Sequence, residues 1–344
     1  MFNRRHILTG LAGAAGGALL GGANLRAQGA AQGGKAIRVT HAVTSLAYIQ
    51  SYVAQYKGFF KENGLSAELV DTGGGGPDVQ LVLGGRAELT VNDGAQILPA
   101  LLKDQKLVCV LSLLNRSIVN ATMRKETAEQ LGITASTPFA EKIKKLKGLR
   151  IGVTRPGALT WQQARSNLVA AGLNPDQDAT VIGVGGAPAL AAALEFGKVD
   201  VIYISMPVGE KLVQDGKAIS FIDNARGEDP KLANFLMEGL WVTPDFIAKS
   251  PDVVASAVRA YSKASAFILS SRPEEIAEVV KPALGSLGDT VLVEGIRRVQ
   301  PAVSKTGRIE AAELETTQAL LRMNGFMERS VSLQEVFNGR FLTA

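Results

Sequence analysis

The chain has 344 residues, of which 46% are hydrophobic and 20% are charged, and its formal net charge is +5. This composition is typical of a globular protein with room for two domains. Its basic residues are spread along the chain, so we expect no nucleic-acid partner. The densest basic stretch, residues 142–147, alternates lysines with Ile143 and Leu146, and we interpret it as the solvated face of an amphipathic helix.

The first 27 residues have the layout of a bacterial signal peptide. Arg4 and Arg5 precede a Gly/Ala/Leu run that continues to Ala23, and Arg26 comes just before the expected cleavage site. The paired arginines and the glycine-diluted run favour the twin-arginine export route over the general one. The alternative is a membrane anchor, but two glycine pairs interrupt the run, which is at the short limit for a span. We expect cleavage, a periplasmic location and a mature net charge of +2, because three arginines and no acid are lost.

Cysteine and histidine are scarce in this sequence. Cys109 is the single cysteine, so an intramolecular disulfide is impossible, and its apolar neighbours predict a small buried side chain. His41 is the only histidine after the predicted signal peptide. Ser-His-Asp triads, Cys-His pairs and multi-histidine metal sites need more than this, so we expect neither a cofactor nor a metal.

From residue 36 onward the predicted elements alternate between strand and helix. Strands are expected at residues 37–40, 66–70, 88–91, 107–113 and 118–123, and helices at 46–57, 78–83 and 96–102. A second set has strands at 149–153, 181–184 and 199–204, and helices at 159–171 and 189–196. Alternation of this kind predicts α/β architecture with mainly parallel sheets flanked by helices.

After a returning strand at residues 236–242, the tail is helical. Helices are expected at residues 253–270, 273–280, 292–299 and 311–323, and we expect them to cover the first α/β set. The two sets predict two lobes, the first made of residues 36–118 with 228–344 and the second of residues 119–227.

Two glycine clusters fail as nucleotide-binding motifs. Residues 73–76 are followed by Pro77 and Asp78, where a phosphate-binding loop needs Gly-Lys-Ser/Thr. Residues 183–188 match the first two glycines of a dinucleotide fingerprint, but the third falls on Pro188.

Five expected strands instead end in short polar or glycine-rich loops that lead into helices. These loops are residues 44–45, 71–76, 92–95, 155–160 and 185–187. Each could be a plain turn, but ligands of open α/β sheets bind beyond the carboxyl ends of the strands, so together the loops predict a binding cleft. Helix N-termini at such a cleft favour an anionic or strongly dipolar ligand.

Several segments, in order, resemble one known family. They are YKGFFKENGL at 56–65, LGGRAE at 83–88, LKGLRIGV at 146–153, and GG at 185–186 with ALAAALEFGKVD at 189–200. Together they resemble the nitrate/sulfonate/taurine-type substrate-binding proteins of ABC importers. The resemblance implies the type II periplasmic-binding fold, a ligand held between two lobes, and docking on an ABC permease in the inner membrane; we expect a monomer.

The resemblance also implies which residues contact the ligand. Carried over by position, they are Ser45, Tyr48, Asn92, Asp93, Pro156, Gly157, Thr160, Gly186 and Ser205. Arg116 and Arg155 are our candidates for binding a ligand anion through charge-assisted hydrogen bonds. Either arginine could instead belong to a solvated surface or to an ion pair between the lobes.

These features predict reversible capture of a small organic anion, such as a sulfonate or carboxylate, without catalysis. One alternative is an exported enzyme on the same fold, with decarboxylase-like or precursor-synthesis chemistry, for which His41 and Asp93 form the only candidate pair. Another is a sensory receptor that uses the same capture. The pyrimidine precursor of thiamine is not expected as a ligand, because the chain has one cysteine and two tryptophans and lacks a cysteine-rich motif.

Overall fold

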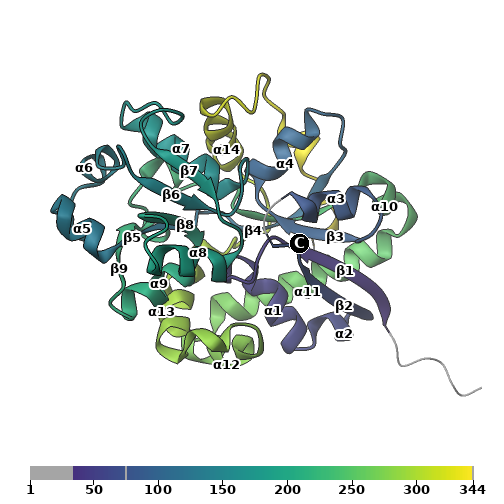
Figure 1. Ribbon diagram of the computed structural model, residues 1–344. Helices are drawn as coiled ribbons and strands as arrows, with labels where there is room; N and C mark the ends of the chain where they lie inside the picture. The colour runs from purple at the N-terminus through teal and green to yellow at the C-terminus, as the bar shows by residue number, and fades with distance from the viewer. Residues whose placement is uncertain (1–33, 74–75, 343–344) are drawn as a thin grey trace, which may run out of the picture. The chain divides into compact units, whose positions relative to one another are not determined.

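A computed structural model describes residues 34–73 and 76–342, and Figure 1 shows how their helices and strands are arranged. The predicted signal peptide, residues 1–27, lies outside the described residues. Within the described residues the strands form two five-stranded sheets, which we name sheet A and sheet B. No helix in this part of the chain is long and apolar enough to cross a membrane.

In sheet A, four strands run in one direction and one is reversed. The strand order is β2 (Leu65–Asp71), β1 (Lys35–His41), β3 (Leu89–Asn92), β10 (Glu238–Val242) and β4 (Val108–Leu114). β1 pairs in parallel with β2 and β3, whereas β10 is antiparallel to β3 and β4. The first residues of β10 therefore lie at the same sheet edge as the last residues of β3.

Sheet B repeats this pattern. Its order is β7 (Thr180–Gly183), β6 (Arg150–Val153), β8 (Val201–Ser205), β5 (Val119–Arg124) and β9 (Ala218–Ile222), with β5 reversed. Every residue of β8 is buried, as expected of a strand covered on both faces. The predicted α/β class with two mainly parallel sheets is confirmed, while the residue boundaries of two lobes stay a prediction.

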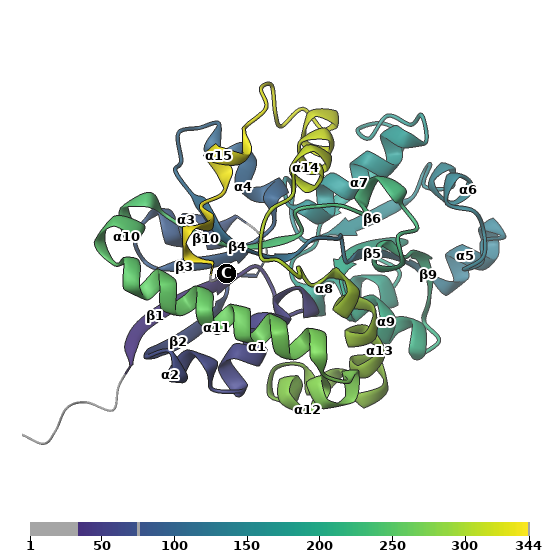
Figure 2. The same cartoon turned by 180° about the vertical axis from the view of Figure 1, so that it is seen from behind.

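Helices cover both faces of sheet A. They are α1 (Ile49–Tyr56), α2 (Phe59–Glu62), α3 (Pro77–Leu83), α4 (Gly94–Leu101), α10 (Pro244–Lys249) and α11 (Pro251–Ser270). α11 crosses the rear of sheet A (Figure 2) and packs against α1 and α2. Val254, Tyr261 and Ile268 lie two helical turns apart along α11 and are fully buried, so this helix presents one apolar stripe to the core.

On the side of sheet B lie α5 (Lys125–Leu131), α6 (Phe139–Lys144), α7 (Leu159–Ala170), α8 (Ala187–Glu195) and α9 (Val208–Gln214). The sequence predicts α7 and α8, but α5, α9 and β9 were not expected. These segments are seven residues long or shorter, which is too short for a periodic apolar pattern to stand out.

The last helices contact both halves of the fold. They are α12 (Pro273–Leu284), α13 (Asp289–Val299), α14 (Ala311–Met323) and α15 (Leu333–Val336). α13 packs against α9, and α14 packs against both α4 and α7. The expectation that the tail covers the first α/β set is therefore incomplete, because α13 and α14 also contact helices of sheet B.

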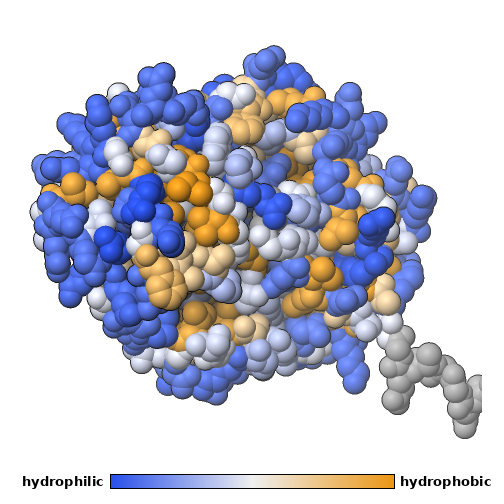
Figure 3. Space-filling model, in the orientation of Figure 1, coloured by the Kyte–Doolittle hydropathy of each residue, from blue (hydrophilic) through white to orange (hydrophobic). Residues whose placement is uncertain are grey.

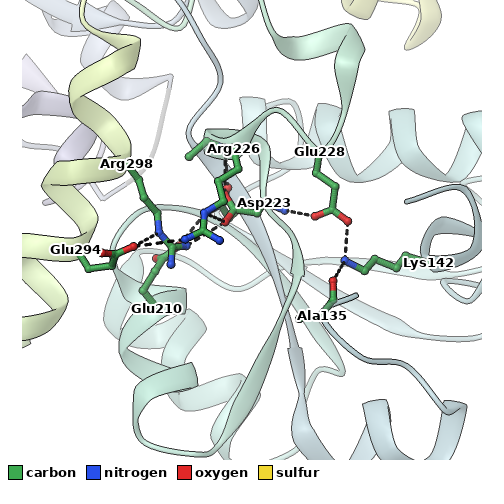
Figure 4. A network of polar contacts seen from close by, with 10 residues as sticks. Ala135, Lys142, Glu210, Asp223, Arg226, Glu228, Glu294 and Arg298 are labelled. Atoms are coloured by element: carbon green, nitrogen blue, oxygen red, sulfur yellow. Dashed lines mark hydrogen bonds and ion pairs between the residues drawn. The ribbon is translucent and has the colours of Figure 1, made fainter. Parts of the chain in front are cut away.

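A polar network joins α13 to the segment that follows β9 (Figure 4). Arg298 donates hydrogen bonds to Asp223 Oδ2 at 3.0 Å and to Glu294 Oε1 at 2.9 Å. Arg226 forms ion pairs with the same two carboxylates. The Arg298 side chain is only 19% exposed, so water can replace its hydrogen bonds only in part.

Lys142 corrects the interpretation of residues 142–147 as a solvated face. Its side chain is 1% exposed, and its Nζ donates to Glu228 Oε1 at 2.6 Å and to the carbonyl of Ala135 at 2.9 Å (Figure 4). Lys144, Lys145 and Lys147 are exposed as predicted. The local pattern could not identify Lys142 as buried, because its carboxylate partner lies 86 residues further along the chain.

Replacing Arg298 with methionine is expected to lower the free energy of unfolding by about 2 kcal/mol, because two charge-assisted hydrogen bonds are lost at a half-buried site. Urea unfolding measures the effect. Arg272→Met is the control, since Arg272 pairs with Glu275 in an exposed contact and should change stability by less than about 0.5 kcal/mol. Equal losses in both variants would show that Arg298 does not tie α13 to its neighbours.

Gly239 in β10 leaves room for two neighbouring side chains. A Cβ atom at this position would lie 2.7 Å from Cys109 Sγ and 3.0 Å from Trp241 Nε1. Trp241 is fully buried, and its Nε1 donates to the carbonyl of Asn92 at 2.8 Å. Both neighbours are fully buried, so neither can move outward into solvent.

Gly239→Ala is therefore expected to lower the free energy of unfolding by about 1–3 kcal/mol through overpacking. The matched control is Gly285→Ala, where φ is −63° and the nearest atoms would lie at 3.7 Å, an ordinary contact. Chemical denaturation of both variants measures their free energies of unfolding. A Gly239→Ala protein as stable as the parent would show that Cys109 and Trp241 can make room for a Cβ atom at this position.

Candidate functional site

A small cavity lies between the facing edges of the two sheets. Its volume is about 40 Å³. Sheet A contributes residues after β1 and β3 and at the start of β10, and sheet B contributes residues at the start of β5, after β6 and at the end of β8: Val43, Asp93, Glu238, Val119, Thr154 and Ser205. We call this space the central cavity.

Two larger grooves lie nearby. The apolar groove, about 390 Å³, is lined by residues that include Thr44, Asp71, Gly186 and Ala191, and it shares Val43 with the central cavity. Figure 3 shows hydrophobic residues gathered over the neighbouring region of β7 and α8. The polar groove, about 340 Å³, is lined by residues that include Gly76, Ala95 and Arg155. Each of the five loops predicted to converge lines at least one of these three spaces.

Hydrogen bonds cross directly between the two halves beside the central cavity. The amide of Leu46, at the start of the short 3₁₀ helix η1 (Leu46–Tyr48), donates to the carbonyl of Met206 at 3.0 Å. The side-chain Nε2 of Gln162, on α7, donates to the carbonyl of Ala95 on α4 at 3.2 Å. These contacts connect residues on the sheet A side directly to residues on the sheet B side.

Ser45 and Tyr48 have different roles at the end of β1. Ser45 is fully buried, and its Oγ accepts a hydrogen bond from the amide of Ala47 at 3.1 Å, so it caps η1. Tyr48 lines the central cavity, stacks on His41 with ring centroids 4.5 Å apart, and accepts from the amide of Ala42. Burial and the nearby carboxylates raise the pKa of the Tyr48 hydroxyl well above its ordinary value, so this group stays a hydrogen-bond donor.

Asn92 and Asp93 at the end of β3 also have different roles. The Asn92 side chain is buried, donates to Asp78 Oδ2 at 2.7 Å and accepts from the amide of Asp93, so both ends of its amide are occupied. Asp93 caps α4 by accepting from the amide of Gln96 at 2.8 Å, and it lines the central cavity. Burial, reinforced by the charge of Asp78, raises the pKa of Asp93 to about 7.

Glu238 is a residue of the central cavity that sequence reasoning missed. It is the first residue of β10, is only 2% exposed, and its Oε2 has no hydrogen-bond partner. Burial, with the charges of Asp93 and Asp78, raises its pKa well above the ordinary value. The available signal was a single charged residue in the apolar run LMEGLWV at residues 236–242.

Thr160 and Ser205 both line the sheet B side of the central cavity. The Thr160 hydroxyl is 2.8 Å from that of Thr154 and accepts from the Thr154 amide at 3.1 Å, which fixes the start of α7. Ser205, at the end of β8, is 8% exposed and faces the cavity. The structure thus brings Tyr48, Asp93, Thr160 and Ser205, four of the residues that the resemblance implies, to the lining of one cavity. Their contact with a ligand stays a prediction.

The other predicted site residues lie outside the lining of the central cavity. Arg155, Pro156 and Gly157 line the polar groove, and Gly186 lines the apolar groove. Arg155 acts on Asp78, where its positive charge opposes the rise in pKa that burial causes. Arg116 is half-buried between β4 and β5 and does not reach the cavity.

His41 lies behind Tyr48 rather than in the cavity. It is fully buried, and its Nε2 is 2.9 Å from Ser51 Oγ, which is in turn 2.8 Å from the hydroxyl of Tyr261. Its Nδ1 is 3.8 Å from Asp71 Oδ1, which is longer than a hydrogen bond. Burial lowers the pKa of His41 despite the nearby Asp71, so the ring is neutral and packs as part of the core. The pair His41 and Asp93 is therefore not assembled around one space.

The fold is shared with several proteins of known structure, two of which are solute-binding proteins by description. A protein from Bordetella bronchiseptica RB50 matches with a TM-score of 0.77 and 22% identity, over 89% of this chain and 95% of that chain. The alkanesulfonate-binding protein SsuA from Xanthomonas axonopodis pv. citri, bound to MOPS, matches with a TM-score of 0.69 and 16% identity, over 89% of this chain and 99% of that chain. The periplasmic nitrate-binding protein NrtA from Synechocystis PCC 6803 matches with a TM-score of 0.68 and 13% identity, over 90% of this chain and 86% of that chain. The expected periplasmic-binding fold is confirmed.

An enzyme also shares this fold. The desulfurization enzyme DSZB matches with a TM-score of 0.58 and 19% identity, over 89% of this chain and 97% of that chain. The fold therefore does not separate binding from catalysis. No curated protein sequence matches the chain.

A family model gives the assignment at the level of sequence. The model described as NMT1/THI5 like matches residues 46–276, a span that runs from η1 to α12 and contains the residues that line the central cavity except Ala42 and Val43. Together with the sulfonate- and nitrate-binding neighbours, this match confirms the resemblance found in the sequence. The chain belongs to the NMT1/THI5-like family.

Proposed function

We propose that this protein is the extracytoplasmic substrate-binding component of an ABC importer. It captures a small organic solute between two lobes, built around sheet A and sheet B, and the closed form docks on a permease in the inner membrane. The observation that supports this role is the central cavity, whose lining comes from both sheets in roughly equal parts. A ligand placed there contacts both lobes and stabilises closure.

Reversible capture also fits the chemistry of the central cavity. Its lining includes carboxyl and hydroxyl groups, but His41 lies behind Tyr48 and Cys109 is buried in β4. Burial raises the pKa of the Cys109 thiol far above the range in which a nucleophilic thiolate forms. The alternative, an exported enzyme on the same fold, keeps one supporting observation, the likeness to DSZB. We therefore propose binding without catalysis.

The lining of the central cavity does not include the arginines expected to bind an anion. The sequence favours an anion through helix N-termini, Arg116 and Arg155. Neither arginine lines the central cavity, so the present proposal specifies only a small organic solute. Export along the twin-arginine route, cleavage after residue 27, a periplasmic location and a monomeric state complete the proposal.

Thermal unfolding with a panel of sulfonates, carboxylates, nitrate, amines, amidines and amino acids tests this function. Only ligands that bind the folded state raise the unfolding midpoint. We expect one chemical class to raise it, with the compound recovered unchanged by mass spectrometry. Conversion of the compound would support the enzyme instead, and a panel without any shift would remove the binding proposal.

Ser205→Ala is expected to weaken binding of the solute identified in this way by about fivefold, the value of one hydrogen bond, while the midpoint without ligand stays within 1–2 °C or so of the parent. Titration calorimetry measures the affinity. Ser136→Ala, in an exposed loop away from the cavity, is the matched control and should bind like the parent. Equal affinities of all three proteins would place the ligand elsewhere.

A further inference from the structure

The charged groups at the central cavity are all acidic. Asp93 and Glu238 line it, and no lysine, arginine or histidine does so among the residues that the structure describes. Asp78 lies close by, at the start of α3, and its carboxylate accepts from Asn92 Nδ2 and from the amides of Gly76 and Val79. The surroundings of the cavity therefore favour positive charge.

Glu238 is the strongest indication of a missing partner. Its side chain is almost fully buried, and its Oε2 has no hydrogen-bond donor within reach. Burying an ionised carboxylate without a hydrogen-bond partner costs more free energy than burying an unpaired neutral polar group. A ligand group that donates hydrogen bonds and carries positive charge would satisfy Glu238 when it enters the cavity.

The remaining lining specifies the kind of cation. Val119, Leu159, Ile204 and Met237 form apolar walls, and the hydroxyls of Tyr48 and Ser205 add polar contacts. Within the described residues no group of three or more His, Cys, Asp and Glu side chains is arranged to hold a metal ion. Apolar walls around two carboxyl groups fit an organic cation better than a hydrated inorganic one.

We infer, building on the binding role proposed above, that the central cavity takes a small organic solute through a cationic nitrogen group, an ammonium or amidinium, held between Asp93 and Glu238. This selectivity is opposite in sign to that expected from the sequence. Arg155 does not neutralise the pair, because it lines the polar groove and acts on Asp78.

The proposed contact also has a defined pH dependence. The raised pKa values of Asp93, about 7, and of Glu238 mean that both groups hold protons in the empty protein at mildly acidic pH. A bound cation favours the ionised forms, so its binding releases protons, and its affinity rises with pH toward and beyond 7 by up to about tenfold per pH unit for each proton released. The neighbouring titratable and charged groups are Tyr48, whose raised pKa keeps it neutral, Asp78, Arg155 and the buried, neutral His41.

Two sets of isosteric probes separate charge from shape. Acetamidinium, acetamide and acetate form the small set, and benzamidinium, benzamide and benzoate form the larger one. Each probe is added to the purified protein at pH 5.5, 6.5, 7.5 and 8.5 with EDTA present, and the unfolding midpoint and the heat of binding are measured. We expect an amidinium to raise the midpoint, more strongly at higher pH, and calorimetry in buffers of different ionisation enthalpy to show proton release.

Glu238→Gln keeps the size of the side chain and removes its charge. We expect it to weaken amidinium binding about 30-fold or more. Asp93→Asn should act in the same direction, and asparagine retains the cap of α4. Glu328→Gln, the same change at an exposed position, is the control and should bind like the parent. Circular dichroism and the midpoint without ligand show whether each variant is folded, and two independent variants keep the test valid if one of them fails to fold.

The possible outcomes separate this inference from the proposed function. Tighter binding of amidinium than of its amide and carboxylate, lost in Glu238→Gln or Asp93→Asn, supports the inference. Preferential binding of acetate, benzoate, a sulfonate or the neutral amides overturns the cationic class but leaves the binding role intact. If no solute of these sets or of the wider panel raises the midpoint, the binding role itself fails.

Discussion

Strand direction is the constraint from which the position of the site follows. In each sheet, four strands point their carboxyl ends toward one edge, and the reversed strand brings its amino end to that same edge. Two such edges face one another, so loop residues and the first residues of β5 and β10 line one space. Asp93 and Glu238 lie 145 positions apart in sequence and share that space because β3 and β10 are antiparallel neighbours.

The buried carboxyl groups near this edge differ in how well their hydrogen bonds are satisfied. Asp78 has its hydrogen bonds satisfied by two backbone amides and by Asn92, so it supports the end of β3 as a structural residue. Glu238 Oε2 has no such partners. The free-energy cost of burying it must be offset by favourable packing elsewhere in the protein. Functional sites commonly contain groups that the folded protein alone leaves unsatisfied.

The sequence predicted the α/β class and most strands, because these depend on local apolar patterns. Of the five loops predicted at strand ends, residues 92–95 and 155–160 reach the central cavity, and the other three line the grooves beside it. Tyr48, Asp93, Thr160 and Ser205 were implied by the resemblance to a known family, and all four line the central cavity. Their contact with a ligand stays a prediction.

Lys142 was predicted to be exposed and Glu238 was not identified at all. The burial of both side chains depends on residues far away in the sequence, which a local pattern does not contain. Arg116 and Arg155 carried the right charge for an anion, but strand order places neither in the lining, and a single sequence does not contain side-chain directions.

The position of α14 has a consequence for the kinetics of release. This helix packs on α4, which follows β3 of sheet A, and on α7, which follows β6 of sheet B, and none of its residues lines the central cavity. If the protein binds solutes as proposed, moving the two halves apart disturbs one of these two contacts, so part of the free energy of opening is set by residues outside the central cavity. Observed affinity combines intrinsic contact with the population of the closed form. Substitutions along α14 can thus change how long a solute is retained while leaving untouched the preference among solutes.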